Sequence, residues 1–248
     1  MSGRRRSLYL CACAVLVLVI GVAAWNVAAI LLEYRAGEQT YARISELSRL
    51  PAHSAPPEAQ ESAEALSARN FAALEEAIPD VVAWISIPGT NIDYPVVQGA
   101  DNSYYLTHLA TGEENSAGSI FLDYRAASDF SQPYSIIYGH NLRSGTMFTG
   151  LNQYKKQDFY EEHPLGVLET PGGDYEIAFF SGFVACKDHE VWDTDMATND
   201  FSAWAERMVE QSWFRAARFP VETDRILTLS TCTYEFDNAR FVLLGILR

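Results

Sequence analysis

The segment Arg225-Ile-Leu-Thr-Leu-Ser-Thr-Cys232 and the run Arg240-Phe-Val-Leu-Leu-Gly-Ile-Leu247 decide the fold of this chain. Both are rich in aliphatic and β-branched residues, and the polar stretch 233–239 separates them. The pattern predicts two antiparallel strands joined by a loop, with Cys232 ending the first and Arg240 beginning the second. We therefore expect a thiol and a guanidinium side by side at one edge of a sheet.

Five further runs of this kind lie upstream, between Gly, Pro, Asn and Asp residues. Short strands at such spacing are typical of a sheet closed into a barrel or packed as a sandwich. Helical spacing of apolar residues interrupts them at 147–162 and 200–217. We therefore predict a mainly β domain over residues 79–248. Its expected strands are 82–87, 92–97, 119–123, 134–138, 175–185, 225–231 and 240–247.

The N-terminus differs in composition from the rest of the chain. Residues 8–32 contain no charge, and three arginines at positions 4–6 precede them. About 20 apolar residues in a helix cross the hydrocarbon core of a bilayer, and positive flanks favour the cytoplasmic side. We predict a single-pass membrane anchor over residues 8–32, with residues 1–7 in the cytoplasm and the body outside. The alternative is a cleaved signal peptide, because Val22-Ala-Ala24 offers small residues to a peptidase.

Residues 33–78 are predicted to form a stalk with two helices. Charged and apolar residues alternate at helical spacing over 35–50, and the prolines of 51–57 end that pattern. Residues 58–78 are rich in Ala, Glu and Leu and precede Pro79, which predicts a second helix.

The body is acidic. The chain has 18 Lys and Arg against 32 Asp and Glu, and residues 1–32 hold three of the basic residues and none of the acidic ones. Residues 33–248 therefore carry a net charge of −17. Binding to nucleic acid requires clustered positive charge that displaces counterions from phosphates. The composition thus excludes a nucleic-acid partner.

The cysteines leave two interpretations open. Cys11 and Cys13 lie in the apolar segment, so Cys186 and Cys232 could form a disulfide in an oxidising exterior. The local sequence favours a nucleophile instead, because a positive charge at Arg240 favours thiolate and can stabilise an oxyanion. We interpret Cys186 as a free, buried thiol at a strand end.

A cysteine that forms an acyl-enzyme also needs a proton donor for the leaving amine. His140 directly follows the predicted strand 134–138, which places an imidazole at a strand end. His108 is the second candidate, although it could belong to a packed turn. The remaining histidines are expected at the surface: His53 in the proline-rich stretch, His163 at a helix end and His189 in a polar turn.

These motifs together resemble the sortases, and class B within that family. The resemblance rests on Thr228-Leu-Ser-Thr-Cys232 followed by Arg240, and on Tyr138-Gly-His-Asn141. It covers the chain from about Val81 to the C-terminus, and the helical extension and a long helix over 200–217 also suit class B. The lid motif of pilus-building class C sortases, Asp-Pro-Trp or Asp-Pro-Phe, is absent from the sequence. Further matches are Trp84-Ile-Ser-Ile-Pro-Gly-Thr-Asn-Ile-Asp-Tyr-Pro-Val-Val-Gln98 and Asp101-Asn-Ser-Tyr-Tyr-Leu106.

The resemblance implies a closed eight-stranded β-barrel and a membrane-anchored cysteine transpeptidase of a Gram-positive bacterium. Cys232 would attack the carbonyl of a Thr in the C-terminal sorting signal of a surface protein. His140 would protonate the departing amine and later deprotonate the incoming one, and Arg240 would stabilise the oxyanion. An amine of the peptidoglycan precursor would then resolve the acyl-enzyme and join the protein to the cell wall. No cofactor and no metal are implied.

The resemblance also implies substrate-binding residues. Asn102, Leu106 and Ser230 match positions that line the sorting-signal groove of class B enzymes. Thr231 and Thr233 flank the nucleophile and complete the predicted set, and the backbone amide of Thr233 is a candidate second donor to the oxyanion. The signal could be of the Asn-Pro-Gln-Thr-Asn type or the Pro-x-Thr-Gly type, and polymerisation of pilins is an alternative activity.

Two other functions would use the same part of the chain. A secreted thiol hydrolase would employ Cys232 and His140 but release an acid to water. In a papain-like fold, however, the cysteine begins a helix and precedes the histidine, which is the reverse of the order found here. A non-enzymatic surface module would instead contain a Cys186–Cys232 disulfide.

Overall fold

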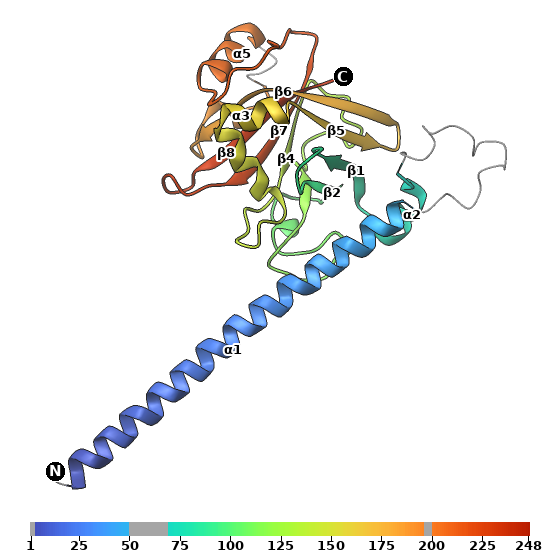
Figure 1. Cartoon of the computed structure of the whole chain (residues 1–248). Coiled ribbons are helices and arrows are strands. Elements are labelled where there is room, and N and C mark those ends of the chain that lie inside the picture. The colour runs from blue at the N-terminus through green and yellow to red at the C-terminus, as the bar shows by residue number, and fades with distance from the viewer. Residues whose placement is uncertain (1–2, 50–68, 196–199) are drawn as a thin grey trace.

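The computed structural model describes residues 3–49, 69–195 and 200–248. The strands of these residues form a closed barrel in the order β1-β2-β3-β4-β7-β8-β6-β5 (Figure 1). Two neighbouring pairs, β2–β3 and β4–β7, are parallel, so the barrel is mixed. The strands are β1 Val81–Ser86, β2 Asp93–Val97, β3 Ile120–Leu122, β4 Tyr134–Tyr138, β5 Leu165–Thr170, β6 Gly173–Ala185, β7 Arg225–Cys232 and β8 Arg240–Leu247.

The prediction of a mainly β, eight-stranded barrel is confirmed. Each of the seven runs identified in the sequence corresponds to a strand, and the bounds of β4 and β8 are those expected. Strand β5 was not predicted from the sequence; it pairs with both β1 and β6 and so closes the barrel. Prolines flank this short strand and Gly166 interrupts its apolar pattern. A side chain at Gly166 would press on the Phe179 ring, with a Cβ 3.1 Å from its Cζ.

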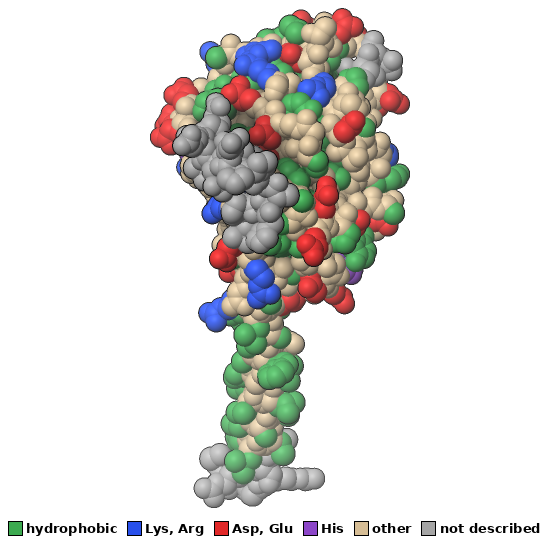
Figure 2. Space-filling model, turned by 90° about the vertical axis from the view of Figure 1, so that its right-hand side faces the viewer, with side chains coloured by type: hydrophobic (Ala, Val, Ile, Leu, Met, Phe, Trp, Pro, Cys, Tyr) green, Lys and Arg blue, Asp and Glu red, His purple; other side chains and the backbone are tan. Residues whose placement is uncertain are grey.

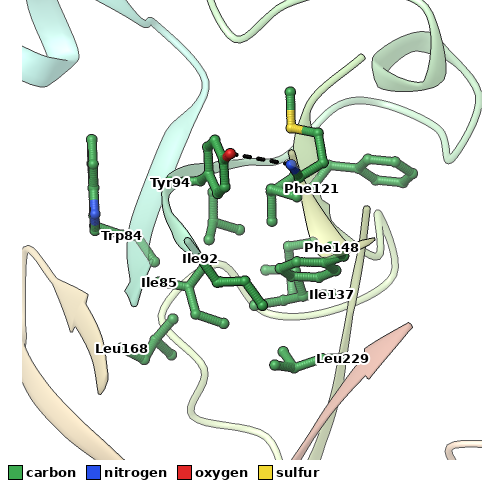
Figure 3. Close-up of a cluster of buried hydrophobic side chains, with 14 of the residues drawn as sticks. Trp84, Ile85, Ile92, Tyr94, Phe121, Ile137, Phe148, Leu168 and Leu229 are labelled. Carbon is green, nitrogen blue, oxygen red and sulfur yellow. Dashed lines mark hydrogen bonds between the residues drawn. The ribbon is translucent and has the colours of Figure 1, made fainter. Parts of the chain in front are cut away.

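The barrel interior is filled by apolar side chains from all eight strands. Full burial of each such side chain stabilises the fold by about 1.5–3 kcal/mol. Tyr94 also uses its hydroxyl, which accepts a hydrogen bond of 3.1 Å from the Met147 amide and ties a loop to the barrel (Figure 3). Figure 3 shows the centre of this core, with Trp84, Ile85, Ile92, Phe121, Ile137, Phe148, Leu168 and Leu229.

A second apolar cluster joins helix α5 (Phe201–Glu210) to strands β4, β6, β7 and β8. Trp204 is buried there and meets the Tyr134 ring edge to face, at a centroid distance of 5.4 Å. The helix is shorter than the predicted 200–217. It ends because the Trp213 amide donates to the Gly182 carbonyl (2.8 Å), and this bond ties the following residues to β6.

The predicted helix over 147–162 is two shorter elements. A 3₁₀ helix, η3 (Phe148–Lys155), and helix α3 (Gln157–Glu162) are separated by Lys156, which has extended backbone angles. Two further 3₁₀ turns lie in loops, η2 (Tyr104–Leu106) and η4 (Glu190–Trp192). The expected strand-rich domain therefore carries little regular helix beside α5 in the described residues.

One long helix, α1 (Gly3–Ser48), contains the predicted apolar segment and the predicted first stalk helix up to Ser48; residue 50 of that prediction lies outside the described residues. It projects away from the barrel (Figure 1). From Tyr9 onward the helix is long enough and apolar enough to cross a membrane. On the face shown in Figure 2, apolar side chains cover the projecting part of α1, and acidic side chains are scattered over the barrel domain. The end of α1 packs on the barrel, where Tyr41 and Ile44 are buried.

The predicted second helix is shorter in the described residues. Helix α2 (Phe71–Ala77) begins only after Asn70, whose side chain accepts a hydrogen bond from the Ala73 amide as an N-cap. The expectation of helix at 69–70 is therefore wrong, because Asn70 is the N-cap and its backbone angles, φ −80° and ψ 81°, are not helical. Residues 58–68 of that prediction, and His53, lie outside the described residues.

Candidate active site

Cys232 and Arg240 are brought together by the register of the last two strands. Residue 232 of β7 pairs directly with residue 240 of β8, and the Arg240 Nη1 donates to the Cys232 Sγ at 2.7 Å. Such a guanidinium stabilises negative charge on the sulfur and can donate to an oxyanion formed next to it. The arrangement that the sequence pattern predicted is thus present in the structure.

His140 reaches the same edge of the barrel through β4, which runs parallel to β7. Tyr138 pairs with Ser230, and the Gly139 amide donates to the Ser230 carbonyl at 3.0 Å, so His140 follows at the level of Cys232. The Asn141 side chain adds a bond of 2.8 Å to the Cys232 carbonyl. These bonds hold the histidine-bearing loop beside the nucleophile.

The imidazole of His140 has one nitrogen occupied. Its Nε2 lies 2.7 Å from the backbone carbonyl of Leu106. A carbonyl oxygen only accepts hydrogen bonds, so Nε2 carries a proton and Nδ1 is the nitrogen left to exchange protons with a substrate. The sequence offered no acidic group to orient this ring, and a backbone carbonyl supplies that contact instead.

Gly118 lies directly beneath this histidine. Its φ of +60° is in the left-handed region, and a Cβ there would stand 2.8 Å from the His140 Cδ2 and 2.8 Å from the Leu106 carbonyl oxygen. Only glycine combines that backbone angle with so close an approach. Gly118 therefore allows the ring and its acceptor to meet.

A cavity of about 260 Å³ contains the three predicted catalytic residues. Four of the five predicted substrate-binding residues also line it. The hydroxyls of Ser230 and Thr231 are buried and have no hydrogen-bond partner among the described residues. The lining residues are Asn102, Leu106, Phe121, Tyr138, Gly139, His140, Ser230, Thr231, Cys232 and Arg240.

Comparison with known proteins identifies the family. The sortase domain model matches residues 85–247, more than half of the chain. The chain belongs to the sortase family. It is 37% identical over 175 residues to sortase B of Listeria monocytogenes serovar 1/2a, covering 69% of this chain and 71% of that protein. Sortase B of Staphylococcus aureus is 34% identical over 163 residues, which is 65% of this chain and 67% of that protein.

Solved structures agree with the sequence comparison. The structure of a Staphylococcus aureus sortase B–substrate complex superposes with a TM-score of 0.75 at 28% sequence identity, covering 88% of this chain and 98% of that one. The resemblance to class B sortases drawn from the motifs is therefore confirmed. The protein is an enzyme of a family of cysteine transpeptidases.

Thr233 does not lie in this sortase's cavity. Its side chain bonds to Lys155 and Glu235, and its backbone amide donates to the Ala239 carbonyl at 3.0 Å. The prediction of a free Thr233 amide for the oxyanion is therefore wrong for this structure. The antiparallel pairing of β7 and β8 continues past Cys232 and uses that donor.

A carboxylate that the sequence analysis did not identify supports the opposite wall of the cavity. Asp123 accepts hydrogen bonds from Asn102 (3.0 Å), from the Tyr138 hydroxyl (3.0 Å) and from Arg125, with which it forms an ion pair. Burial opposes the charge, but the bonds from Arg125 and Asn102 outweigh it and lower the pKa of Asp123 to about 2. The sequence feature that could have indicated this ion pair is an Asp at a strand end, two residues before an Arg.

The other candidate thiol and histidines are separate from the cavity. Cys186 is a free thiol, as predicted, but it is exposed rather than buried because β6 ends at Ala185 and the chain turns into solvent. Cys186 and Cys232 are both free in this structure, so they do not form the disulfide of the alternative surface module. His108 stacks on the Tyr104 ring at 4.0 Å and does not line the cavity.

The two remaining described histidines form local structural contacts. The His163 Nδ1 lies 2.9 Å from the Pro88 carbonyl, and the His189 Nδ1 accepts from the Val191 amide at the start of η4. Both residues are partly exposed, which agrees with the expectation that these histidines lie at the surface. Among the described residues, no group of three or more His, Cys, Asp or Glu is arranged to hold a metal ion.

Proposed function

We propose that this sortase cleaves a C-terminal sorting signal after a Thr and transfers the protein to an amine of the cell wall through a thioacyl-enzyme on Cys232. The observation that carries the proposal is one cavity in which Cys232, Arg240 and His140 meet. In the first step the thiolate adds to the Thr carbonyl carbon. Arg240 donates to the oxyanion, since its guanidinium already lies at hydrogen-bond distance from the sulfur.

The proton balance of both steps falls to His140. The imidazolium donates the proton on Nδ1 to the departing amine as the C–N bond breaks, which leaves a thioester and a neutral ring. An incoming amine then attacks the thioester, Nδ1 takes its proton, and Cys232 departs as thiolate. Throughout both steps the Leu106 carbonyl holds the protonated Nε2.

The sorting signal is proposed to bind along the cavity wall formed by Asn102, Leu106, Ser230 and Thr231. Leu106 presents an apolar side chain that is 40% exposed, which suits an apolar part of the signal. The unpartnered hydroxyls of Ser230 and Thr231 suit a polar backbone. Thr233 is not part of this set.

Helix α1 is proposed to anchor the enzyme. We assign residues 1–7 to the cytoplasm, 8–32 to the membrane, 33–78 to the stalk and N-terminal helices, and 79–248 to the extracytoplasmic catalytic barrel. The length and hydropathy of the helix and the arginines before it support this orientation. Tethering the enzyme to the bilayer that carries both its surface-protein substrate and the peptidoglycan precursor raises their effective concentration.

The test is a product analysis with the full-length chain in detergent micelles. Peptides of the Asn-Pro-Gln-Thr-Asn and Pro-x-Thr-Gly types are incubated with and without triglycine, and the products are identified by mass. We expect cleavage after the Thr of one class and transfer of its acyl part to the amine. An acid product whose identity and rate do not respond to the amine would establish a thiol hydrolase instead. Preference for a lysine-bearing pilin peptide as acceptor would indicate polymerisation.

A further inference from the structure

The stalk part of α1 is bonded to the loop that supports His140. Asn115 is almost fully buried, and its Nδ2 donates to the Glu33 carbonyl at 2.9 Å, while the Ser116 amide donates to the Glu33 carboxylate. One turn further along the helix, Gly37 lies against the same asparagine, with a Cβ position 3.5 Å from its side chain. The loop 107–119 is therefore fixed to the helix that leaves the membrane segment.

Tyr41 makes the innermost of these contacts. Its side chain is buried, and its hydroxyl lies 2.9 Å from both the Gly118 carbonyl oxygen and the Ser119 Oγ. Burial raises the pKa of Tyr41 to about 12, so the hydroxyl remains a neutral donor at neutral pH. Ser119 in turn bonds through its hydroxyl to the His108 carbonyl at 2.8 Å, which extends the contact into the turn around Leu106.

Gly118 transmits this contact to the imidazole. A Cβ at Gly118 would be within 2.8 Å of both the His140 ring and the Leu106 carbonyl that accepts from its Nε2. A close-packed backbone has no room to move without displacing one of them. The backbone of Gly118, whose carbonyl accepts from the Tyr41 hydroxyl, therefore lies close against both the ring and its acceptor.

We infer that Tyr41, on the helix that carries the apolar segment, is a positioning residue for His140, and that α1 is thereby part of the support of the active site. The inference rests on the proposed role of His140 in proton transfer. It gives the helix a second task besides attachment. The same rigid element that leaves the membrane segment sets the orientation of the proton donor inside the cavity.

The substitution Tyr41→Phe isolates the hydroxyl. The ring packs edge to face against Tyr94 at a centroid distance of 5.6 Å, and phenylalanine keeps that contact. The matched control is Arg49→Gln. Arg49 ties the end of α1 to Asp93 through an exposed ion pair of 3.1 Å, and Asp93 keeps Arg69 and Trp84 as partners. Among the described residues, the side chains of Arg49 and Asp93 form their hydrogen bonds and ion pairs away from the loop 107–119.

Both variants are measured as full-length proteins in detergent micelles. Active enzyme is counted as the alkylated share of the peptide that contains Cys232 after digestion, because Cys11, Cys13 and Cys186 are free thiols as well. For Tyr41→Phe we expect kcat per active site to fall about tenfold with KM unchanged, because small misplacement of a catalytic group is costly. We also expect the pH profile of kcat to shift, which a merely structural role would not produce. Arg49→Gln is expected to keep the wild-type kcat and profile. A Tyr41→Phe enzyme with wild-type kcat per alkylatable site and an unchanged profile would overturn the inference.

A second measurement separates this inference from the proposed function. Nitrogen chemical shifts of the His140 ring report which nitrogen carries the proton, independently of turnover. In the neutral ring we expect the proton on Nε2 in the wild type, where the Leu106 carbonyl accepts it, and a mixture of the two tautomers in Tyr41→Phe. Identical spectra would contradict the inference even in a protein that transfers no peptide. Absence of transpeptidation by a wild-type protein with the expected spectra would contradict only the proposed function.

Discussion

The two sides of the cavity are held in different ways. On one side, Cys232 and Arg240 are opposite partners in a regular antiparallel ladder, and their 2.7 Å contact follows from strand register alone. On the other side, His140 leaves a strand and takes its orientation from Leu106 and Gly118, which belong to a loop. The nucleophile and its arginine are therefore placed by secondary structure, whereas the proton donor is placed by tertiary contacts.

This difference concerns robustness as well as geometry. Strands β7 and β8 are held together by many backbone hydrogen bonds, which do not depend on any one side chain. Replacing the side chain of Cys232 or Arg240 is therefore expected to change the reaction rate and to leave the fold intact. The histidine depends on a few close contacts between elements distant in sequence. Changes on its side are expected to alter the position of the ring.

The largest effect is expected from Cys232→Ala. Removing the sulfur deletes the nucleophile from a cavity wall, so transpeptidation should fall about 10⁴-fold or more. The ladder contains no side-chain bond that the fold requires at this position, and the thermal unfolding midpoint should stay near that of the wild type. Rates by product mass and a parallel unfolding curve check both parts. A large drop in the unfolding midpoint of Cys232→Ala would contradict the expectation that the pairing of β7 and β8 does not depend on this side chain.

Arg240→Lys tests the other half of the ladder pair. A lysine keeps the charge but lacks the planar set of donors that can serve the sulfur and an oxyanion together. We expect kcat to fall about 10²-fold to 10³-fold, the range seen when an oxyanion donor is removed. Steady-state kinetics at saturating peptide measure this directly. Near-wild-type turnover would contradict the role assigned to Arg240.

Gly118→Ala tests the histidine side. The added methyl group would meet the ring, the Leu106 carbonyl and the Tyr105 carbonyl at under 3.0 Å, so the ring must shift and kcat should fall about 10²-fold. Gly145→Ala is the matched control, because Gly145 also has a positive φ of 83° but open space around it. An equal loss of kcat in the two variants would attribute the effect to backbone strain alone.

Asp123→Asn gives the smallest effect and one that depends on pH. The pKa of Asp123 is lowered in the fold from 3.8 to about 2, so its charge stabilises the protein above pH 4. That stabilisation, up to about 2 kcal/mol, is lost as the pH falls from 4 to 2. The wild type and Asp123→Asn should thus differ in unfolding free energy at neutral pH and converge at pH 2.

Denaturant unfolding at several pH values measures this convergence. Asp129→Asn is the matched control, since Asp129 is an exposed carboxylate that accepts from the Ser131 amide. It should change the unfolding free energy much less at every pH. A constant difference between Asp123→Asn and the wild type down to pH 2 would contradict the ion-pair account of this wall.

The same contrast explains what could be predicted from the sequence. Apolar alternation identified seven of the strands, and the order of Cys232 and Arg240 on consecutive strands gave their proximity. Apolar alternation failed for β5, because Gly166 interrupts the pattern where the Phe179 ring of the neighbouring strand β6 lies against it. It also overextended helix α5, because a bond to Gly182 ends the helix earlier than its apolar spacing suggests.

Around the site, the features that could not be predicted are contacts between segments that are distant in the sequence. The acceptor of His140 is a backbone carbonyl, and a carbonyl is present at every position of a sequence. The sequence shows Asp123 as a carboxylate at the end of a predicted strand. Its hydrogen bonds from Asn102 and Tyr138 could not be predicted, because they form only where three separate segments of the chain meet. The Thr233 amide was predicted to be available to the oxyanion, but in the structure it donates to the Ala239 carbonyl. This bond between the ends of β7 and β8 could not be predicted from the motif.

The central claim is that Cys232 carries the acyl group, and intact mass spectrometry of the full-length protein tests it most directly. The enzyme is mixed with a sorting-signal peptide in the absence of amine, quenched in acid and digested to locate the adduct. The account predicts an added mass equal to the peptide up to and including its Thr, located on Cys232 and removed when triglycine is supplied. Turnover of the peptide with an adduct on another residue, or in the Cys232→Ala protein, would contradict it.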